Sequence, residues 1–323
     1  MANKKRIDLL SQAEIDDLYA RPVFNKEERC LYFSLTHKEF TVAMQYSNER
    51  TQLYFILQLG YFKAKQQFYS FNLEEVIEDA RTVNELYLKN KAILSGRISR
   101  EYSAVQRETI LRLCGYEQFS EKNAKQIMQH LGGLLQIYPK AHNALRQLMV
   151  HFNQGNIIIP AYRTLQDLFT SAYRVEKERL DKLMQSIPAD MQENLQNLIK
   201  TNDGLTELNI IRADQKDFLY TAVRLEVGKA NKIADLYVFS KSFIPKMEIS
   251  KNAVQYYADI TEQYAPFRLR KLSQPSQWLH LTCFISHRYQ QLMDNLIVSF
   301  IYVSCTQYSL RRKSLCRNGA NRV

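Results

Sequence analysis

The sequence NERTQLYFILQLGYFKAKQQFYSF, residues 48–71, is the densest apolar stretch in the chain. Apolar side chains between Leu53 and Phe62 cover nearly every side of a helix, and a helix that is apolar on most faces must be buried on most faces. Gln58 interrupts the run, which is also far shorter than the ~20 apolar residues that a membrane span needs. We therefore predict that this stretch forms the central helix of a soluble helical domain.

Composition extends this prediction to the rest of the chain. The protein has 323 residues, enough for two or three domains of ~100–200 residues each, and 46% of its residues are hydrophobic. Only 9 glycines and 7 prolines are present, which argues against sheets joined by tight turns. We expect an all-α protein with two or more helical domains.

Charge and cysteine usage indicate which binding partners and which cellular compartment to expect. Lys and Arg outnumber Asp and Glu by 44 to 33, which suits nucleic acid first and an acidic membrane surface second, although many basic proteins bind neither. The five cysteines are far apart and form no CxxC pair, so we interpret the first four, at positions 30, 114, 283 and 305, as buried thiols. The first ten residues contain no apolar core of signal-peptide length. We predict a cytoplasmic protein without a membrane partner.

Capping signals and breaks divide the chain into helical segments. Capping-box spacing at Ser11 and Thr36 predicts two short helices, and Asn48 is placed to cap the central helix. The helical stretches on either side of Gly115 are compatible with helix–turn–helix geometry, as they are with an ordinary packed pair. Residues 153–156 and 201–204 interrupt the helical pattern, and a long helix is predicted to begin at Thr164.

The sequence lacks the common motifs of catalytic and metal sites. No HExxH or HxH pattern, no glycine-rich phosphate loop and no GxSxG elbow occurs. We therefore predict no catalytic residues, metal site or cofactor. What remains is a series of basic residues with aromatic residues among them. Neutralisation of phosphates requires such positive side chains. Each basic residue taken alone could equally belong to a solvated charged face. The candidate DNA-binding residues are Arg97, Arg100, Arg107, Arg112, Lys122, Lys125, Arg146 and Arg163.

Several segments carry a resemblance when they are taken in order. They are residues 32–68 with the core Phe55–Leu59, the GYxxF motif at Gly115–Phe119, residues 157–180, and the later helical stretches 268–272 and 292–296. This series is similar to the N-terminal region of Tn3-family transposases, in which a DUF4158-type DNA-binding domain is followed by a further helical region. The resemblance covers about residues 5–303 and ends where a basic tail begins.

The resemblance implies a function and a division of the chain. Such transposases grip the terminal inverted repeats of the transposon with N-terminal helical domains, and DDE carboxylates near their C-terminus hold Mg²⁺ for strand transfer. We expect an apparently truncated transposase that binds double-stranded DNA and is no enzyme on its own, with Mg²⁺ needed only by the missing catalytic domain. The expected parts are an N-terminal DNA-binding domain (1–153), a linker strand and long helix that open a second DNA-binding region (154–204), a helical region that begins a linker or dimerisation part (205–305), and a basic tail (306–323) that is disordered or frameshifted.

Two alternatives remain open at this point. Helices from Thr164 onward could form a protein-interaction or dimerisation module, so that the chain modulates an intact transposase by pairing with it or with a second copy of itself. An enzyme in its own right would require a cluster of carboxylates that converge on Mg²⁺ in the folded chain.

Overall fold

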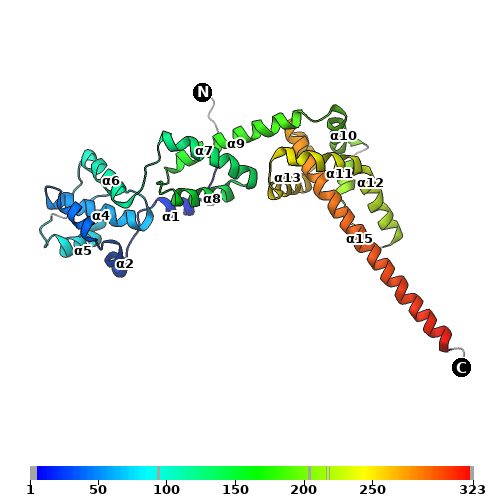
Figure 1. The fold of residues 1–323 in the computed structure, drawn as a ribbon, viewed down its shortest axis with the longest axis horizontal. Coiled ribbons are helices and arrows are strands. Elements are labelled where there is room, and N and C mark those ends of the chain that lie inside the picture. The colour runs from blue at the N-terminus through cyan, green and yellow to red at the C-terminus, as the bar shows by residue number, and fades with distance from the viewer. Residues whose placement is uncertain (1–5, 93–94, 203–204, 216, 218, 321–323) are drawn as a thin grey trace. The chain divides into compact units, whose positions relative to one another are not determined.

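The computed structural model describes residues 6–320 apart from 93–94, 203–204, 216 and 218; of 202 and 306–320, only the backbone is described. Over this range the protein is built of helices with one short two-stranded ribbon, which confirms the all-α prediction (Figure 1). The first elements are α1 (Gln12–Tyr19), α2 (Lys26–Tyr32), α3 (His37–Met44), α4 (Glu49–Lys65), the 3₁₀ turn η1 (Leu73–Val76), α5 (Ile77–Tyr87), α6 (Arg100–Cys114), α7 (Glu121–Ile137), α8 (Ala141–Gln154) and α9 (Tyr162–Gln185). The later elements are α10 (Ala189–Ile199), the antiparallel strands β1 (Thr201–Asn202) and β2 (Leu205–Thr206), α11 (Glu207–Arg212), α12 (Tyr220–Phe243), η2 (Ile244–Met247), α13 (Lys251–Gln263), α14 (Pro266–Arg270) and α15 (Gln274–Ala320).

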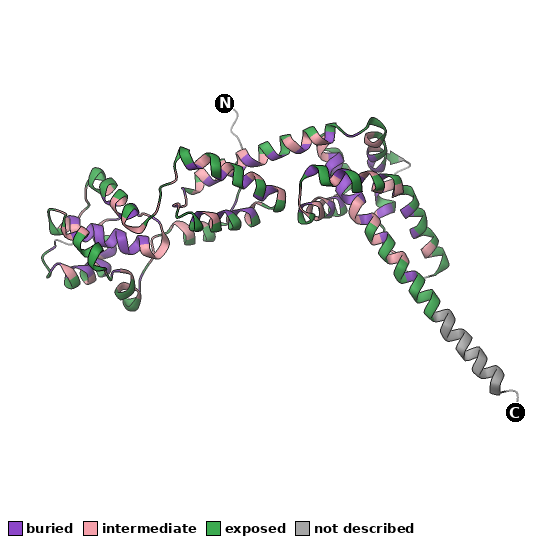
Figure 2. Cartoon of the chain, in the orientation of Figure 1, coloured by how far each residue is buried: buried purple, intermediate pink, exposed green. Residues whose placement is uncertain are grey.

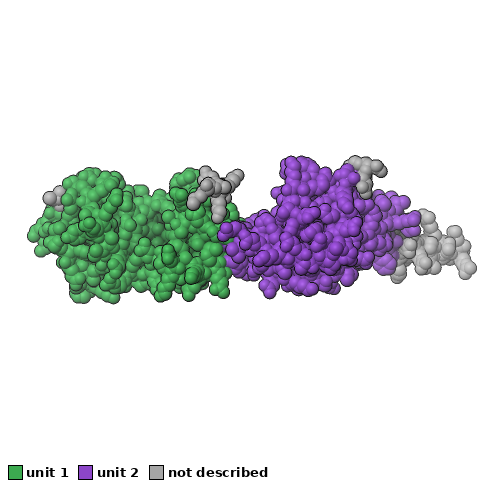
Figure 3. Space-filling model, turned by 90° about the horizontal axis from the view of Figure 1, so that it is seen from above, with its two compact units in different colours: residues 1–131, 141–171 green, residues 132–140, 172–323 purple. Residues whose placement is uncertain are grey.

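The chain folds into two compact units (Figure 3). Unit 1 comprises residues 1–131 and 141–171, and unit 2 comprises residues 132–140 and 172–323. This division differs from the boundaries at 153 and 204 that the sequence analysis places at breaks in the helical pattern. The reason is that α7 and α9 each contribute to both units, so two of the three division points fall inside continuous helices, and the third lies between α7 and α8.

Helix α4 is the centre of unit 1, as the sequence predicts. Every residue from Leu53 to Phe62 is buried, and Figure 2 shows this helix as the most continuously buried element of its unit. Helices α2, α3, α5 and α6 pack against it. Gly60 has a packing role, because a Cβ atom there would overlap with the buried ring of Phe33.

The predicted helix boundaries follow from capping chemistry. Ser11 and Thr36 form complete capping boxes at the starts of α1 and α3, and the Asn48 side chain accepts a hydrogen bond from the Thr51 amide at the start of α4. Gly115 ends α6 in the left-handed conformation with φ of 71°. Helix α6 packs against α4, and the helix–turn–helix interpretation of α6 and α7 stays a prediction.

Unit 2 has a core of its own. Helices α12 and α13 pack along α15, and buried side chains such as Ile233, Phe243 and Phe284 fill the space between the helices. The short segment 132–140 joins this unit through the Ser250 amide, which donates to the Gln136 carbonyl at 2.9 Å, and through the Tyr173 hydroxyl, which donates to the Pro139 carbonyl at 2.6 Å. Because each unit encloses a separate apolar cluster, each has what an independent domain requires.

The C-terminal region includes the basic tail that the sequence analysis predicts, and its disorder stays a prediction. The backbone of α15 continues as a helix through 306–320, whereas residues 321–323 lie outside the described part. An established helix extends without a new nucleation step, because each added residue contributes one hydrogen bond. The sequence pattern of the tail gives no sign of this extension because it lacks apolar periodicity.

Candidate nucleic-acid interface

A groove in unit 1 brings three of the eight candidate DNA-binding residues together. It encloses a cavity of about 840 Å³, and its lining comes from α4, α6 and the two segments 69–71 and 97–98. The residues that determine its chemistry are Tyr54, Tyr69, Phe71, Arg97, Arg100 and Arg107. The positive charge of this hollow therefore comes from the three arginines, and the aromatic rings beside them are almost fully buried, at 3% for Tyr54, 7% for Tyr69 and 3% for Phe71.

Hydrogen bonds from α4 hold the walls of this groove. The Tyr54 hydroxyl contacts the carbonyl oxygens of Phe71 and Gly96 at 3.1 and 2.8 Å, so one side chain of α4 reaches both segments. Gly96 adopts a φ of 83°, and its amide donates to the Glu74 carboxylate at 2.9 Å. Because glycine adopts positive φ without strain, the turn at Gly96 leads the chain from the groove wall into α6.

Arg107 is the most deeply placed cation of the groove. Its guanidinium lies 5.6 Å from the centre of the Phe68 ring, a cation–π contact, and its Nε atom is buried without a hydrogen-bond partner. Among the residues that the structure describes, no carboxylate pairs with it. Burial lowers the pKa of Arg107, because removal from water disfavours the charged form. An anion at this position would compensate for that lost hydration.

The other charged groups of the groove leave an excess of positive charge. Arg97 donates from Nε to the Asn72 side chain, and Arg100 is exposed at the first residue of α6. Glu108 also lines the groove, but its carboxylate accepts a hydrogen bond from Arg112 at 2.8 Å. Arg112 is therefore an exposed ion-pair partner and not a member of the groove lining.

The remaining candidates lie elsewhere in unit 1. Lys122 and Lys125 are exposed on α7, and Arg163 is exposed on α9, where its charge lowers the pKa of Asp167 after the larger effect of the Arg6 hydrogen bond. Arg146 lines a smaller cavity of about 410 Å³ between α1 and α8. All eight predicted residues belong to unit 1, but the groove unites only Arg97, Arg100 and Arg107.

A comparison with known protein families covers the region that contains these candidate residues. A family model described as a domain of unknown function, DUF4158, matches residues 9–172, just over half of the chain. The chain belongs to the DUF4158 family. No curated protein matches the sequence.

The DUF4158 region contains the whole groove and all eight candidate residues. This domain is found at the N-termini of Tn3-family transposases, in agreement with the resemblance of the sequence to that region. Its last residue, 172, falls next to the end of unit 1 at residue 171. The candidate interface is thus a feature of the DUF4158 domain.

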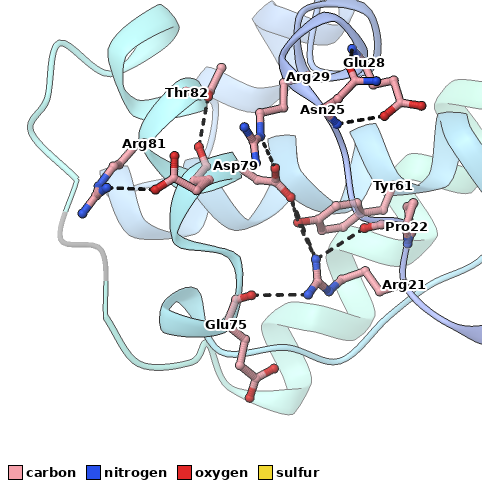
Figure 4. Close-up of polar contacts among 11 residues, drawn as sticks. Arg21, Pro22, Asn25, Glu28, Arg29, Tyr61, Glu75, Asp79, Arg81 and Thr82 are labelled. Carbon is pink, nitrogen blue, oxygen red and sulfur yellow. Dashed lines mark hydrogen bonds and ion pairs between the residues drawn. The ribbon is translucent and has the colours of Figure 1, made fainter.

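A buried polar cluster in the DUF4158 domain has a different role. The Asp79 carboxylate accepts hydrogen bonds from Arg29 Nε and the Tyr61 hydroxyl, each at 2.7 Å, and Arg21 lies 3.9 Å away (Figure 4). Burial raises the pKa of Tyr61, and Asp79 raises it further. Because the charges of this cluster are paired within the fold, we interpret it as structural, holding α2 and α5 to α4.

The aromatic residues that border the groove are not among the candidate residues predicted from the sequence. The segment KQQFYSF, residues 65–71, carries three aromatic residues after the end of α4, and this concentration was the available signal. The prediction that the central helix extends to Phe71 is wrong here, because α4 ends at Lys65 and Gln66 adopts a left-handed conformation. Tyr69 lines the groove, and the Phe68 ring contacts the guanidinium of Arg107.

Of the four cysteines predicted to be buried thiols, Cys283 is buried and Cys114 is half-buried, whereas Cys30 and Cys305 are exposed, so that prediction is wrong for these two. Two further statements hold for the described residues. No group of three or more histidines, cysteines and carboxylates lies close enough together to hold a metal ion. None of the described helices combines the length and the hydropathy that crossing a bilayer requires. The predicted cytoplasmic location stays a prediction.

Proposed function

We propose that this protein is the DNA-binding part of a Tn3-family transposase and recognises the terminal inverted repeats of the transposon. The observation that carries the proposal is the DUF4158 match, which includes every predicted DNA-binding cation. The charge distribution supports it, since residues 89–163 contain eleven lysines and arginines but only four glutamates and no aspartate. Positive side chains in this excess neutralise phosphates and release the counterions of the duplex.

The proposed role is recognition without cleavage. Exposed cations on α6, α7, α8 and α9 contact the sugar–phosphate backbone and fix the protein on the duplex. In this proposal the DDE carboxylates and the Mg²⁺ that strand transfer needs belong to the catalytic domain of a transposase. The binding partner is double-stranded DNA that carries a Tn3-type inverted repeat.

A salt series tests this function. We expect the full chain to shift a duplex with a Tn3-type inverted repeat in preference to a scrambled duplex, with affinity that falls as salt rises. Exchange of the exposed Arg163 for Gln should reduce the slope of log K against log salt by about 1, because one phosphate contact is lost. Arg81→Gln is the matched control, since Arg81 is exposed on α5, pairs with Glu78 and is not a predicted contact. Equal binding of both duplexes, or a salt-independent affinity, would refute the proposal.

A second candidate function, self-association, is favoured by the end of α15. Figure 2 shows that α15 passes from buried residues to an exposed stretch. The apolar residues of this stretch are nearly consecutive in the sequence and therefore lie on several sides of the helix. Their exposure is 55% for Ile297, 52% for Val298, 75% for Phe300 and 55% for Ile301. Exposed apolar groups in such number mark interaction surfaces, and a second copy of the chain would cover them.

Light scattering over a concentration series tests self-association. We expect a molecular mass that rises with concentration, and we expect the substitution Phe300→Glu to keep the protein monomeric by placing a charge in the buried contact. Val150→Glu, at an exposed apolar position on α8, is the control and should associate like the unchanged protein. A monomer at every concentration would rule this function out.

A further inference from the structure

We propose that α8 reads the sequence of the DNA, with Asn143, Gln147 and Val150 against base edges in the major groove. The inference rests on the proposed DNA-binding function and deepens it. The predicted cations hold a duplex of any sequence, whereas these three residues select the inverted repeat. None of the three carries a charge, so a count of basic residues along the chain could not find them.

Helix α8 has one buried side and one open side. Its residues Ala144, Leu145, Leu148 and Phe152 are buried in unit 1. Its exposed residues recur every three or four positions, so they form a single stripe along the helix. They are Asn143, Arg146, Gln147, Val150, Asn153 and Gln154. The amide side chains of this stripe form no hydrogen bond with the residues that the structure describes, so their donors and acceptors are open to a ligand.

The charge of α8 suits a polyanion. Among the helices α1 to α9, which all lie in the described part of the chain, only α8 lacks an acidic residue. Its stripe therefore presents one positive charge, on Arg146, and no carboxylate that would repel a phosphate. Glu14 of α1 lies 4.0 Å from His142 and lines a cavity together with Arg146, so this acid is at the edge of the stripe and not on it.

The uncharged residues of the stripe match base edges. Asparagine and glutamine side chains pair with adenine through N6 and N7, and a small apolar group packs on the thymine methyl group. Gln147 follows Asn143 by four residues, and Val150 follows Gln147 by three, so the three side chains lie in one row. The row predicts A·T pairs at neighbouring positions of the bound sequence. The amide groups of Asn153 and Gln154 extend it toward the end of α8.

The dimensions of α8 fit the major groove. From Asn143 to Gln154 the helix rises by about 16 Å, the length of about five base pairs. A helix with its side chains is about 10–12 Å wide, and the major groove is about 12 Å wide. The stripe is therefore long enough for the three or four side chains that a DNA-reading helix places against bases.

Cations flank the stripe. Arg146 lies along one edge, and His151 lies beyond the other, because successive residues advance by about 100° around a helix. The His151 ring stacks on the His130 ring of α7 with a centroid distance of 4.1 Å, so α7 runs beside α8. Lys122 and Lys125 are exposed on α7. Cations on both sides of a base-reading row contact the two backbones that border the groove.

Affinities for two DNA sequences test which residues read bases. Fluorescence anisotropy measures the affinity of the full chain for a duplex with the inverted repeat and for a scrambled duplex. We expect Asn143→Ala and Gln147→Ala each to weaken binding of the inverted repeat by about tenfold and to leave binding of the scrambled duplex unchanged, because a bidentate base contact contributes a discrimination of this order. Both residues are exposed and alanine favours the helix, so these variants keep the fold.

Two further variants separate reading from holding. Arg146→Gln should weaken binding of both duplexes by the same factor and lower the salt slope by about 1, because a phosphate contact carries no sequence information. Gln45→Ala is the matched control, since Gln45 is an exposed amide at the end of α3 and lies outside α8. It should bind both duplexes as the unchanged protein does.

Base analogues locate the contacts in the major groove. Exchange of the adenines of the repeat for 7-deazaadenine removes the N7 acceptor, which faces only that groove. We expect this DNA to bind the unchanged protein more weakly than the normal repeat, but to bind the double variant of Asn143 and Gln147 to alanine as well as the normal repeat does. Exchange of thymine for uracil removes the methyl group, and it should weaken binding of the unchanged protein but not of Val150→Ala.

The possible failures are distinguishable. If the alanine variants keep the full preference for the inverted repeat, α8 does not read the sequence, and the duplex-binding function stands without it. An equal loss on both duplexes in Gln147→Ala would make α8 a non-specific backbone contact and overturn the inference as well. No preference for the inverted repeat in the unchanged protein would overturn the proposed function itself.

Discussion

Exchange of Asp79 for Ala is expected to lower the free energy of unfolding by about 3–5 kcal/mol, the usual cost of removing one partner of a buried ion pair. The Asp79 side chain is 6% exposed, and it accepts hydrogen bonds from Arg29 and Tyr61 while Arg21 lies close by. Without the carboxylate, two guanidinium groups with limited exposure face each other across the Tyr61 hydroxyl. Their repulsion and lost hydration act against the packing of α2 and α5 on α4.

Urea unfolding followed by circular dichroism measures this change. The control is Glu78→Ala on the same helix, because Glu78 forms an exposed pair with Arg81 that contributes at most about 1 kcal/mol. The sole tryptophan, Trp278, lies in unit 2, so its fluorescence follows the other unit in the same sample. If Asp79→Ala shifts the circular dichroism midpoint no more than Glu78→Ala does, the cluster does not hold unit 1 together.

Exchange of Arg288 for Met is expected to destabilise unit 2 by at least about 2 kcal/mol, since the Ile211 and Arg212 carbonyls lose their donor and an unsatisfied acceptor costs about 1–3 kcal/mol. The Ala213 carbonyl keeps a hydrogen bond from Lys229. Arg288 is buried and donates to the carbonyl oxygens of Ile211, Arg212 and Ala213 at 2.9, 3.0 and 3.0 Å. These carbonyls lie at the end of α11, where the helix itself provides no donors. Methionine keeps much of the apolar stem but offers no N–H group.

Trp278 fluorescence during urea unfolding reports this second change directly, because that residue is buried in the core of unit 2. Arg224→Met is the control, since Arg224 is exposed on α12. We expect its midpoint to remain close to that of the unchanged protein. A midpoint for Arg288→Met that equals the control would mean that water replaces the guanidinium at the end of α11.

These two clusters also show why the sequence predicts some features and not others. Helix α4 is recognisable because ten consecutive buried residues leave a local apolar signature, and capping boxes are local as well. The hydrogen-bond partners of Asp79, Tyr61 and Arg29, are 18 and 50 residues away in the chain, the carbonyl partners of Arg288 are 75–77 residues away, and no periodic pattern links them. Such pairs become visible only when the fold brings distant segments together.

The same distinction applies to the candidate interface. Charge counting along the chain found Arg97, Arg100 and Arg107, because basic residues recur in that region. It could not separate them from Arg112, which lies on the same helix but pairs with Glu108. Which cation lines a hollow depends on the angle at which α6 packs on α4, and composition carries no information on that angle.

The bridge that Tyr54 forms to Phe71 and Gly96 has a consequence for the kinetics of recognition. Since α4 is enclosed by its own unit, the walls above it are already in position before any ligand arrives. A preorganised site pays little entropy for ordering the protein, so most of that penalty falls on the nucleic acid. Association should then be limited by the encounter with the DNA and not by rearrangement of these walls.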